Sequence, residues 1–401
     1  MRILFISQLF DPEYSIKGLA LMQRLVAEGH QVEVLTTFPN YPTGKVFDGY
    51  SVKFRQVDDC SGVRVIRLWS HISHSKSKLS RAWSYLSFTL MALFASLFSQ
   101  KPDVVYAYHP QSTTGLIGLL MKLFRGVPFI TDVQDLWPDA LIATGMRKDS
   151  MLLRGIGHWC ALVYKHASQI VVLSEGFRQA LINRGVPAQK IHLVYNWCPE
   201  EQRIAAVLEQ SANSSQGDGA ASFVYAGNLG SAQALTTMIK ALGSFDKNKL
   251  TFTLIGGGVE KEQLKRFVAE AGYNNIFFSD YVPATQIFDV LSTADVLVIH
   301  LKDDDLFRIT IPSKTQSSMA MGKPILMAVG GEANQLLVKA KGGEGAEPED
   351  QQSIQQAAVR LLAIRQTWPE LGHNARIFYQ QRLSMDVNYR KLLTVLAGAT
   401  K

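Results

Sequence analysis

The sequence is poor in cysteine. Cys60, Cys160 and Cys198 are the only three among 401 residues, and they lie far apart. Three separated thiols supply neither the four ligands of a zinc ribbon nor the paired framework of a small secreted domain. A chain of this length builds a large core without such cross-links. We therefore expect a protein of the reducing cytoplasm.

Several patterns that mark other protein classes are also missing. The chain has no Gly-x-Ser-x-Gly elbow, no Walker A sequence and no His-Glu-x-x-His. His71 and His74 have no further ligands at zinc spacing, and we expect the acidic run 303–305 to be solvated rather than metal-binding. Heptads, a collagen period and internal repeats are absent too, which excludes fibrous and solenoid folds.

The first residues do not predict a signal peptide. Four apolar residues follow Arg2, but polar and acidic side chains arrive at Gln8, Asp11 and Glu13. A secretory signal needs a longer uninterrupted apolar stretch. We expect this segment to be a buried first strand instead.

Positive charge is concentrated in the first half of the chain. Residues 1–200 hold 21 Lys and Arg against 14 Asp and Glu, whereas the remainder holds 20 of each, so the net charge of +7 belongs to the first half. This imbalance favours an anionic partner such as a phosphate or anionic lipid, although solubility alone is the simpler explanation. The basic residues are scattered and no nucleic-acid-binding module is present, so we do not expect nucleic-acid binding.

Short apolar runs alternate with helix-like stretches along the first half. Near-continuous apolar runs are typical of parallel strands that are covered on both faces, and their alternation with helices predicts a doubly wound sheet. The expected strands are 2–7, 31–37, 63–68, 103–108, 127–132, 169–173 and 190–194, and the expected helices include 18–29 and 112–124.

The alternation starts again in the second half. We expect strands at 222–226, 251–255, 275–279, 296–300 and 324–328, with helices at 232–242, 261–271, 286–292 and 317–321. The chain then divides into a first domain, 1–200, a linker, 201–221, that includes the small polar run 211–219, and a second domain, 222–376. A terminal helix, about 377–401, packs back on the first domain. Two Rossmann-like domains of class α/β would face a central cleft at the carboxyl ends of their strands.

Residues 82–100 form a stretch of nineteen residues without a charge. Five Ser and Thr residues interrupt it, and a predicted strand follows directly. We consider a buried or half-buried helix, a helix lying in a membrane interface and a true membrane span. Lys76, Lys78 and Arg81 stand before Trp83 and Tyr85, and this combination of cations and aromatic rings favours the interfacial alternative over a span.

Three glycine-containing turns follow predicted strands. They are Ser15–Gly18, Tyr225–Gly230 and Ile255–Gly258. Glycines let backbone N–H groups approach an anion, and the following helix adds positive potential at its amino terminus. Each turn alone can simply be a tight corner. Three such turns at one cleft predict a diphosphate or nucleotide site.

Other polar side chains are expected at the same edges. Arg308, Ser313 and Lys314 surround Pro312, which fixes the entry to a helix, and they could bind phosphate oxygens or be solvated. His109 ends a predicted strand and is either structural or part of the cleft. Asp135, in the run Thr131–Pro138, could act as a base toward an acceptor hydroxyl or cap a helix.

At this point nearly the whole chain resembles the GT-B retaining glycosyltransferases of family 4. It is most similar to the bacterial surface-polysaccharide branch that includes the L-fucosamine transferase type. The resemblance is carried by four motifs together: Thr37–Gly44, Gln134–Pro138, Tyr225–Gly230 and Pro312–Gln316, the last followed by Met319–Ala320 and Gly322–Pro324.

The resemblance implies a GT-B fold and a metal-independent hexosyltransferase. The enzyme would move an N-acetylated or deoxy hexose from a UDP-sugar to a polyprenyl-diphosphate-linked acceptor in O-antigen, capsule or exopolysaccharide synthesis. It would act at the inner face of the inner membrane, as a peripheral protein on its anionic surface. The implied catalytic residues are His109, Lys314 and Arg308; the implied donor-binding residues are Gly18, Gly227, Asn228, Gly256, Gly257, Tyr281, Val282, Ser313, Gln316 and Ser317; the implied acceptor-binding residues are Lys17 and Asp135.

The chain departs from the family pattern at charged positions. Ile309 and Ser317 occupy the places of the family's Glu-x7-Glu pair, and Asn228 and Gln233 those of its phosphate-facing Arg and Lys. The charge must then come from elsewhere, and Arg308 and Lys314 are the candidates. A nucleotide-binding regulatory or scaffold protein and a UDP-sugar epimerase remain the alternatives on the same fold.

Overall fold

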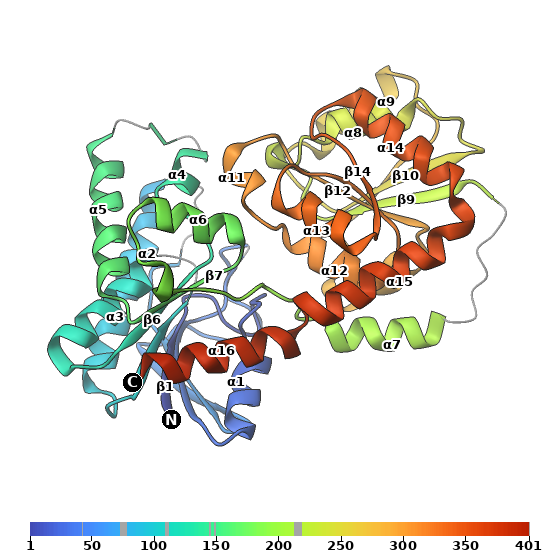
Figure 1. The fold of residues 1–401 in the computed structure, drawn as a ribbon. Helices are drawn as coiled ribbons and strands as arrows, with labels where there is room; N and C mark the ends of the chain where they lie inside the picture. The colour runs from blue at the N-terminus through green and yellow to red at the C-terminus, as the bar shows by residue number, and fades with distance from the viewer. Residues whose placement is uncertain are drawn as a thin grey trace. The chain divides into compact units, whose positions relative to one another are not determined.

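The computed structural model describes residues 1–41, 43–72, 78–108, 112–143, 146–147, 150–211 and 219–400. The chain divides into two compact units (Figure 1). Unit 1 comprises Met1–Tyr195 together with Asn388–Lys401, and unit 2 comprises Asn196–Val387. Each unit is an α/β structure built on its own sheet, as the sequence predicts.

Unit 1 contains an eight-stranded sheet in the order β3-β4-β2-β1-β5-β6-β7-β8. All neighbouring strands pair in parallel except β3, which is antiparallel to β4. The central strands are almost wholly buried because helices cover the sheet, which is why they consist of continuous apolar runs. The strands are β1 (Arg2–Ile6), β2 (Gln31–Thr37), β3 (Arg55–Cys60), β4 (Val63–Leu68), β5 (Val104–Ala107), β6 (Phe129–Val133), β7 (Gln169–Val172) and β8 (Ile191–Leu193).

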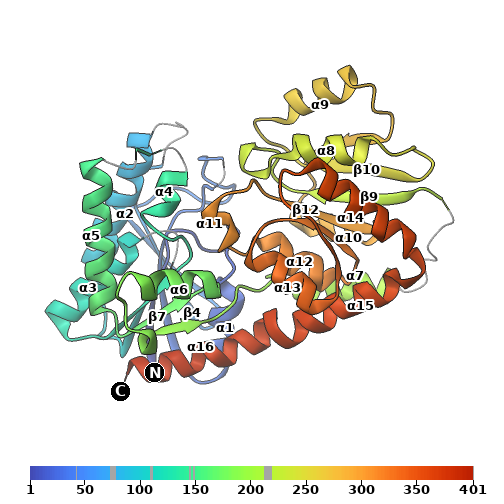
Figure 2. The same ribbon diagram turned by 45° about the horizontal axis from the view of Figure 1, so that its top comes forward.

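The helices of unit 1 connect these strands. Serines begin two of them, because the Ser150 and Ser174 hydroxyls accept the otherwise unpaired N–H groups of Leu153 and Phe177. The helices are α1 (Leu19–Ala27), α2 (Lys78–Phe98), α3 (Ser112–Arg125), α4 (Asp139–Ala143), α5 (Met151–His166), α6 (Glu175–Asn183) and the terminal α16 (Met385–Ala399). Helix α3 packs between α2 and α5, and the three lie side by side (Figures 1 and 2).

Unit 2 contains a six-stranded parallel sheet in the order β11-β10-β9-β12-β13-β14. Its core gathers large buried side chains such as Phe223, Phe252 and Trp368. The strands are β9 (Ala221–Ala226), β10 (Leu250–Ile255), β11 (Ile276–Ser279), β12 (Val296–His300), β13 (Ile325–Ala328) and β14 (Gly343–Gly345). The helices are α7 (Glu201–Ser211), α8 (Leu235–Gly243), α9 (Lys261–Glu270), α10 (Ala284–Ser292), α11 (Asp305–Arg308), α12 (Ser313–Met321), α13 (Glu332–Ala340), α14 (Gln351–Ala363) and α15 (Trp368–Phe378).

Every strand that the sequence predicts is present, and two further strands were missed. Strand β3 is a half-exposed edge strand with a polar sequence, and β14 is a three-residue Gly-Glu-Gly segment. Neither carries the apolar run by which buried strands are found. Helix α12 begins at Ser313 rather than at residue 317, because Pro312 is its N-cap.

The expected domain boundaries need correction. Residues 201–211, predicted to belong to a linker, form α7, which packs against α10 and α12 within unit 2. The rest of the predicted linker up to residue 218 lies outside the described residues. The terminal segment is not one helix from residue 377 either, since a π-helical turn at Tyr379–Leu383 separates α15 from α16. The chain passes back into unit 1 at Asn388.

Helix α2 is half-buried. Phe88 and Ala92 point into unit 1, whereas Leu90, Phe94 and Phe98 are exposed, the last with 76% of its surface accessible. No helix in the described ranges combines the length and the hydropathy that a membrane crossing requires, which removes the span alternative for α2. The structure agrees with the half-buried alternative and leaves the interfacial one open.

A buried ion pair joins the loop after β1 to the end of β6. The Lys17 ammonium donates to the Asp132 carboxylate, and both side chains are fully inaccessible. The same carboxylate accepts from the Tyr106 hydroxyl and from the Gln134 amide, the latter at 2.6 Å. Burial lowers the pKa of Lys17, while Asp132 opposes that shift. These contacts fix the carboxyl ends of β1, β5 and β6 relative to one another.

The ion pair gives a stability prediction. We expect Lys17→Met to destabilise unit 1 by about 3–5 kcal/mol, because it leaves the Asp132 charge buried without its partner. The double variant Lys17→Met, Asp132→Leu should recover much of this loss, because it removes both charges. The measurement is the unit 1 transition in differential scanning calorimetry. The exposed Lys53→Met is the control, with an expected change within about 0.5 kcal/mol. A single variant as stable as wild type contradicts the prediction.

Candidate active site

The predicted donor-binding residues of unit 2 follow the carboxyl ends of its strands. Gly227 and Asn228 come directly after β9, Gly256 and Gly257 after β10, and Tyr281 and Val282 shortly after β11. Lys314 lies in the first turn of α12. In an open parallel sheet this edge is where ligands bind.

Gly227 and Gly256 pack backbone against backbone. Gly227 has φ 141° and Gly256 has φ 139°, a region that side chains rarely permit. A Cβ on Gly256 would lie 2.0 Å from the Gly227 carbonyl oxygen, and a Cβ on Gly227 would lie 2.6 Å from the Lys314 Nζ. Glycine at 227 therefore leaves room for the lysine ammonium, and glycine at 256 lets the two turns pack backbone against backbone.

Lys314 is a half-buried cation that no carboxylate neutralises among the residues described. Its Nζ lies 3.8 Å from the centroid of the Tyr225 ring and donates to the Tyr225 hydroxyl, which in turn donates to the Asn228 carbonyl oxygen at 2.8 Å. Burial lowers the pKa of Lys314 to about 7. An ammonium in this environment gains more from a bound anion than an exposed lysine does.

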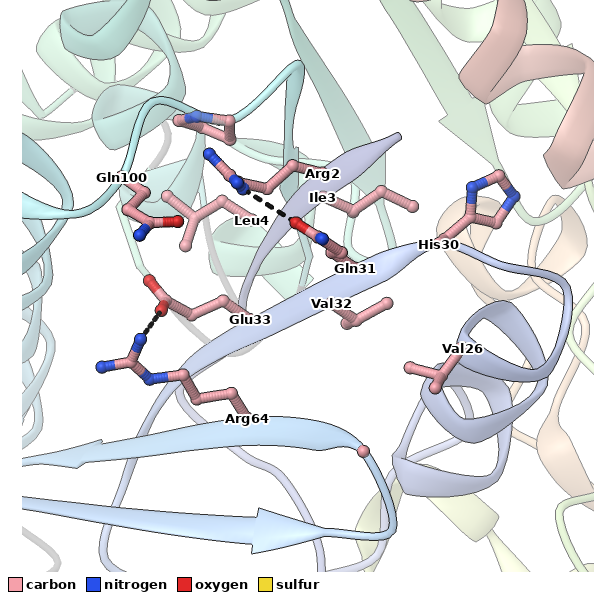
Figure 3. Close-up of a pocket in the computed structure, with 12 residues that line it drawn as sticks. Arg2, Ile3, Leu4, Val26, His30, Gln31, Val32, Glu33, Arg64 and Gln100 are labelled. Atoms are coloured by element: carbon pink, nitrogen blue, oxygen red, sulfur yellow. Dashed lines mark hydrogen bonds and ion pairs between the residues drawn. The ribbon is translucent and has the colours of Figure 1, made fainter.

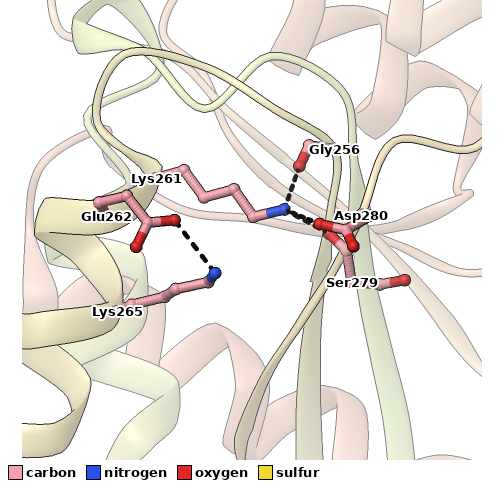
Figure 4. A network of polar contacts seen from close by, with 6 residues as sticks. All are labelled: Gly256, Lys261, Glu262, Lys265, Ser279 and Asp280. Atoms are coloured by element: carbon pink, nitrogen blue, oxygen red, sulfur yellow. Dashed lines mark hydrogen bonds and ion pairs between the residues drawn. The ribbon is translucent and has the colours of Figure 1, made fainter.

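A second lysine holds the glycine-rich turn after β10 in place (Figure 4). Lys261 Nζ donates to the carbonyl oxygens of Gly256 and Ser279, at 2.9 and 3.1 Å, and to the Asp280 carboxylate at 2.8 Å. The turn also exchanges backbone hydrogen bonds with the one after β9, since Leu229 N donates to Gly257 O at 2.8 Å. Lys261 thus has a positioning role, and its charge is compensated by Asp280.

The remaining predicted donor residues differ in their accessibility. Ser313 and Tyr281 are exposed, and Tyr281 has 73% of its surface accessible. Asn228 and Gln233, which replace the family's cations, hydrogen-bond to each other at 3.1 Å. Ser317 is partly buried and donates to the Lys314 carbonyl oxygen. Gln316 is buried, and its amide faces the Pro312 and Ser313 carbonyls.

Arg308 does not supply a second uncompensated cation. Its guanidinium makes two contacts of 2.8 Å with the Asp303 carboxylate. It lines a separate pocket of about 490 Å³ with Gly330 and Gly331, at the start of α13. Asp304 caps α11 by accepting from Leu306 N, so these members of the acidic run have structural partners. The sequence therefore predicted the placement of Arg308 at this edge but not its neutralisation.

The predicted unit 1 residues are buried, occupied by a neighbouring carboxylate, exposed, or outside the described ranges. Lys17, predicted to contact an acceptor, is fully buried against Asp132 in this structure. The amino terminus of α1 already holds an acid, since Leu19 N donates to the Asp11 carboxylate at 2.6 Å, and a Cβ on Gly18 would strike the same carboxylate. Gly18 therefore offers no open anion position. Asp135 is exposed just after β6, whereas His109 lies outside the described residues.

A further pocket of unit 1 lies at the opposite, amino edge of the sheet (Figure 3). Its polar groups bind each other: Arg2 Nε donates to the Gln31 amide oxygen at 3.2 Å, and Arg64 pairs with Glu33 at 3.4 Å. Groups that are already satisfied in this way have little to offer a ligand. We therefore do not assign the chemistry to this pocket.

The sequence missed Tyr225, Lys261 and the pair Gly330–Gly331 as site residues. Tyr225 looks like an ordinary strand residue, and its hydroxyl matters only because Lys314 folds over it. Gly330 and Gly331 could have been found, since a glycine pair between a strand and a helix is the same signal that singled out Gly256 and Gly257.

Comparison with known proteins identifies both halves of the chain. Residues 19–197 match the model of the glycosyl transferase 4-like domain, and residues 220–363 match the model of the glycosyl transferases group 1. Together the two models span most of unit 1 and most of unit 2.

Individual relatives are distant. "Probable glycosyltransferase WbjE" from Pseudomonas aeruginosa is 23% identical over 277 residues, which are 68% of this chain and 68% of the relative. "Putative colanic acid biosynthesis glycosyl transferase WcaI" from Escherichia coli K12 is 23% identical over 335 residues, 80% of this chain and 82% of the relative. The crystal structure of HepE from Anabaena in complex with UDP has a TM-score of 0.70 at 15% identity and covers 99% of this chain and 100% of its own. The chain therefore belongs to the glycosyltransferases of the GT-B fold, with a glycosyl transferase 4-like domain followed by a group 1 domain.

Proposed function

We propose that the protein transfers a hexose, of N-acetylated or deoxy type, from a UDP-sugar to a polyprenyl-diphosphate-linked glycan, with retention of anomeric configuration. The product would serve surface-polysaccharide synthesis. Two comparisons support this proposal: WcaI is named for colanic acid biosynthesis, and HepE has been crystallised with UDP and with UDP-glucose.

The observation that carries the proposal is the uncompensated Lys314 cation beside Gly227 and Gly256. In the transfer, the bond between the anomeric carbon and the diphosphate oxygen breaks, and the nucleoside diphosphate leaves with the electron pair. Negative charge grows on the diphosphate as this happens. A fixed ammonium and the backbone N–H groups of the glycine turns lower the barrier, by about 3 kcal/mol for each well-placed donor.

The acceptor is the second reactant, and we propose that residues of unit 1 bind it. Its hydroxyl oxygen forms the new bond to the anomeric carbon, and its proton passes to the departing diphosphate. We propose that Asp135 orients this hydroxyl and that His109 touches the transferred sugar. In this proposal Lys314 and the glycine turns stabilise the negative charge of the leaving diphosphate, and no metal ion is required. Arg308, beside the start of α13, is the third proposed catalytic residue.

We further propose that unit 1 lies on the anionic inner face of the inner membrane. Helices α2, α3 and α5 contain no Asp or Glu and carry six basic residues: Lys78, Arg81, Lys122, Arg125, Arg154 and Lys165. The same helices expose large apolar side chains, namely Trp83, Leu86, Leu90, Phe94 and Phe98 of α2, Leu123 and Phe124 of α3, and Met151, Leu152 and Leu162 of α5. Cations beside exposed apolar groups favour a monotopic contact with anionic lipid.

The donor class is tested by a thermal-shift screen with UDP-, GDP- and dTDP-sugars. We expect UDP compounds to raise the Tm by about 5 °C at saturating concentration, because ligands that bind only the native state stabilise it. Stabilisation by GDP- or dTDP-sugars alone would overturn the choice of nucleotide. The stabilising UDP-sugar is then incubated with the protein in the absence of an acceptor. The appearance of an epimer would favour the epimerase alternative.

Lys314→Met is expected to lower turnover about 100-fold or more while raising stability at neutral pH. The folded-state pKa of Lys314 lies below its usual value, so the unfolded chain binds the proton more tightly. The stability gain of the variant should be largest below pH 7 and should shrink as the pH rises toward 10. Turnover and Tm across this pH range are the measurements.

The matched control for this variant is Lys323→Met. Lys323 is also partly buried, and burial lowers its pKa, but it lies just before the amino end of β13. We expect the control to keep wild-type turnover. Equal turnover of wild type and Lys314→Met would remove Lys314 from the reaction.

Membrane contact is tested by flotation with vesicles that contain phosphatidylglycerol. We expect the protein to float at low salt and less at high salt, because salt screens exposed charges. The exposed substitutions Phe94→Glu and Phe98→Glu should abolish flotation, whereas Val359→Glu, exposed on α14 of unit 2, should not. Failure of the wild type to float at low salt would refute the membrane contact.

A further inference from the structure

Unit 1 contains a cavity that the proposed transfer site does not use. It has a volume of about 710 Å³ and lies between α5 and the segment that joins α6 to β8. Its lining includes Trp137, Pro138 and Asp139, which follow β6, as well as Lys165 and Lys190. Small-molecule sites commonly have volumes in this range, about 300–1,000 Å³.

The walls of this cavity are mostly apolar. Trp137, Val186 and Pro187 line it together with Ala161 and the aliphatic stems of the two lysines. From Gly157 to Lys165 its wall follows α5 over about two turns, which corresponds to roughly 12 Å along the helix axis. A wall of this length is long enough to line a short apolar chain.

One buried polar group in the wall is unsatisfied. Tyr164 has only 4% of its surface accessible, and its hydroxyl has no hydrogen-bond partner among the described residues. Burial raises the pKa of Tyr164, while Arg184 opposes this shift, so the hydroxyl stays protonated and can donate. A buried hydroxyl without a partner is costly unless a ligand or water completes its hydrogen bond.

Cations outnumber acids around the cavity. Among the described residues, Arg184, Lys165 and Lys190 line it against a single carboxylate, that of Asp139. Arg184 pairs with Asp139 and donates to the Trp137 carbonyl oxygen at 2.8 Å, and the Lys190 ammonium donates to the Lys165 and Ala167 carbonyls. The guanidinium has five N–H groups, so these contacts leave donors over for a phosphate. The net positive lining favours an anionic amphiphile over a neutral one.

We propose that this cavity binds the diphosphate and the first isoprene units of a prenyl-linked acceptor. The Tyr164 hydroxyl and Arg184, which lies beside Trp137, bind phosphate oxygens, and the apolar walls along α5 enclose the chain. The occupant is identified as a prenyl diphosphate because the inference rests on the acceptor class of the proposed function. Ala161 and Leu162 are exposed on α5, so the cavity adjoins the helix layer proposed to contact the membrane.

The test is calorimetric titration of the full chain with farnesyl diphosphate, without a sugar donor. We expect it to bind at least about tenfold more tightly than farnesol, inorganic pyrophosphate or dodecyl phosphate. Ala161→Trp fills the cavity from an exposed helix position and should weaken binding about tenfold or more. Tyr164→Phe keeps the ring and should weaken binding about fivefold. His158→Trp, exposed on α5 and outside the cavity lining, is the matched control and should bind as wild type does.

Each outcome decides the assignment. No binding by wild type, or equal binding by Ala161→Trp and His158→Trp, would overturn it, and equal binding of dodecyl phosphate would overturn the prenyl identity. The UDP-sugar assay on the same samples separates this inference from the proposed function. If Ala161→Trp abolishes farnesyl diphosphate binding but the wild type shows no transfer activity, the cavity assignment is supported and the proposed transfer is refuted. If the wild type transfers sugar but does not bind farnesyl diphosphate, the transfer is supported and the cavity assignment is refuted.

Discussion

A positive charge held over an aromatic ring, with no carboxylate beside it among the described residues, is the constraint on which the candidate site of unit 2 depends. Lys314 lies against the turn after β9 where residue 227 has no side chain, and the Tyr225 ring beneath its ammonium comes from the preceding strand. The fold provides no carboxylate opposite this cation among the described residues. Such an arrangement is unfavourable in the empty protein and favourable once an anion is bound, which is the usual relation between stability and function at a binding site.

The two units use buried charge in opposite ways. In unit 1 the Lys17 ammonium pairs with the Asp132 carboxylate, which also accepts hydrogen bonds from Tyr106 and Gln134. This network fixes the ends of the strands. In unit 2 the Lys314 ammonium meets only a phenol and an aromatic face. Both lysines lie near the carboxyl edge of a parallel sheet. Among the described residues they differ in whether a carboxylate lies beside the ammonium.

This difference explains how far sequence reasoning succeeds. The buried strands are found because continuous apolar runs report burial on both faces, and the glycine turns are found because strand, glycine and helix follow one another in sequence. Lys17, Gly18 and Arg308 were placed at the correct edges but misjudged, because Asp132, Asp11 and Asp303 neutralise or occupy those positions. Asp132 is far from Lys17 in the sequence, and Asp11 reaches the start of α1 across a loop. No spacing rule in the sequence reveals such partners.

The return of the chain to unit 1 after residue 387 has a consequence for biosynthesis. Tyr195 N donates to the Asn388 side chain at 3.0 Å, and the Arg24 guanidinium lies 4.2 Å from the centroid of the Tyr389 ring, so α16 completes the packing around α1. Synthesis of unit 1 thus begins first, and its last segment is the last part of the chain to be translated. A ribosome delivers all of unit 2, which can fold as a continuous unit, before the segment that closes unit 1 emerges.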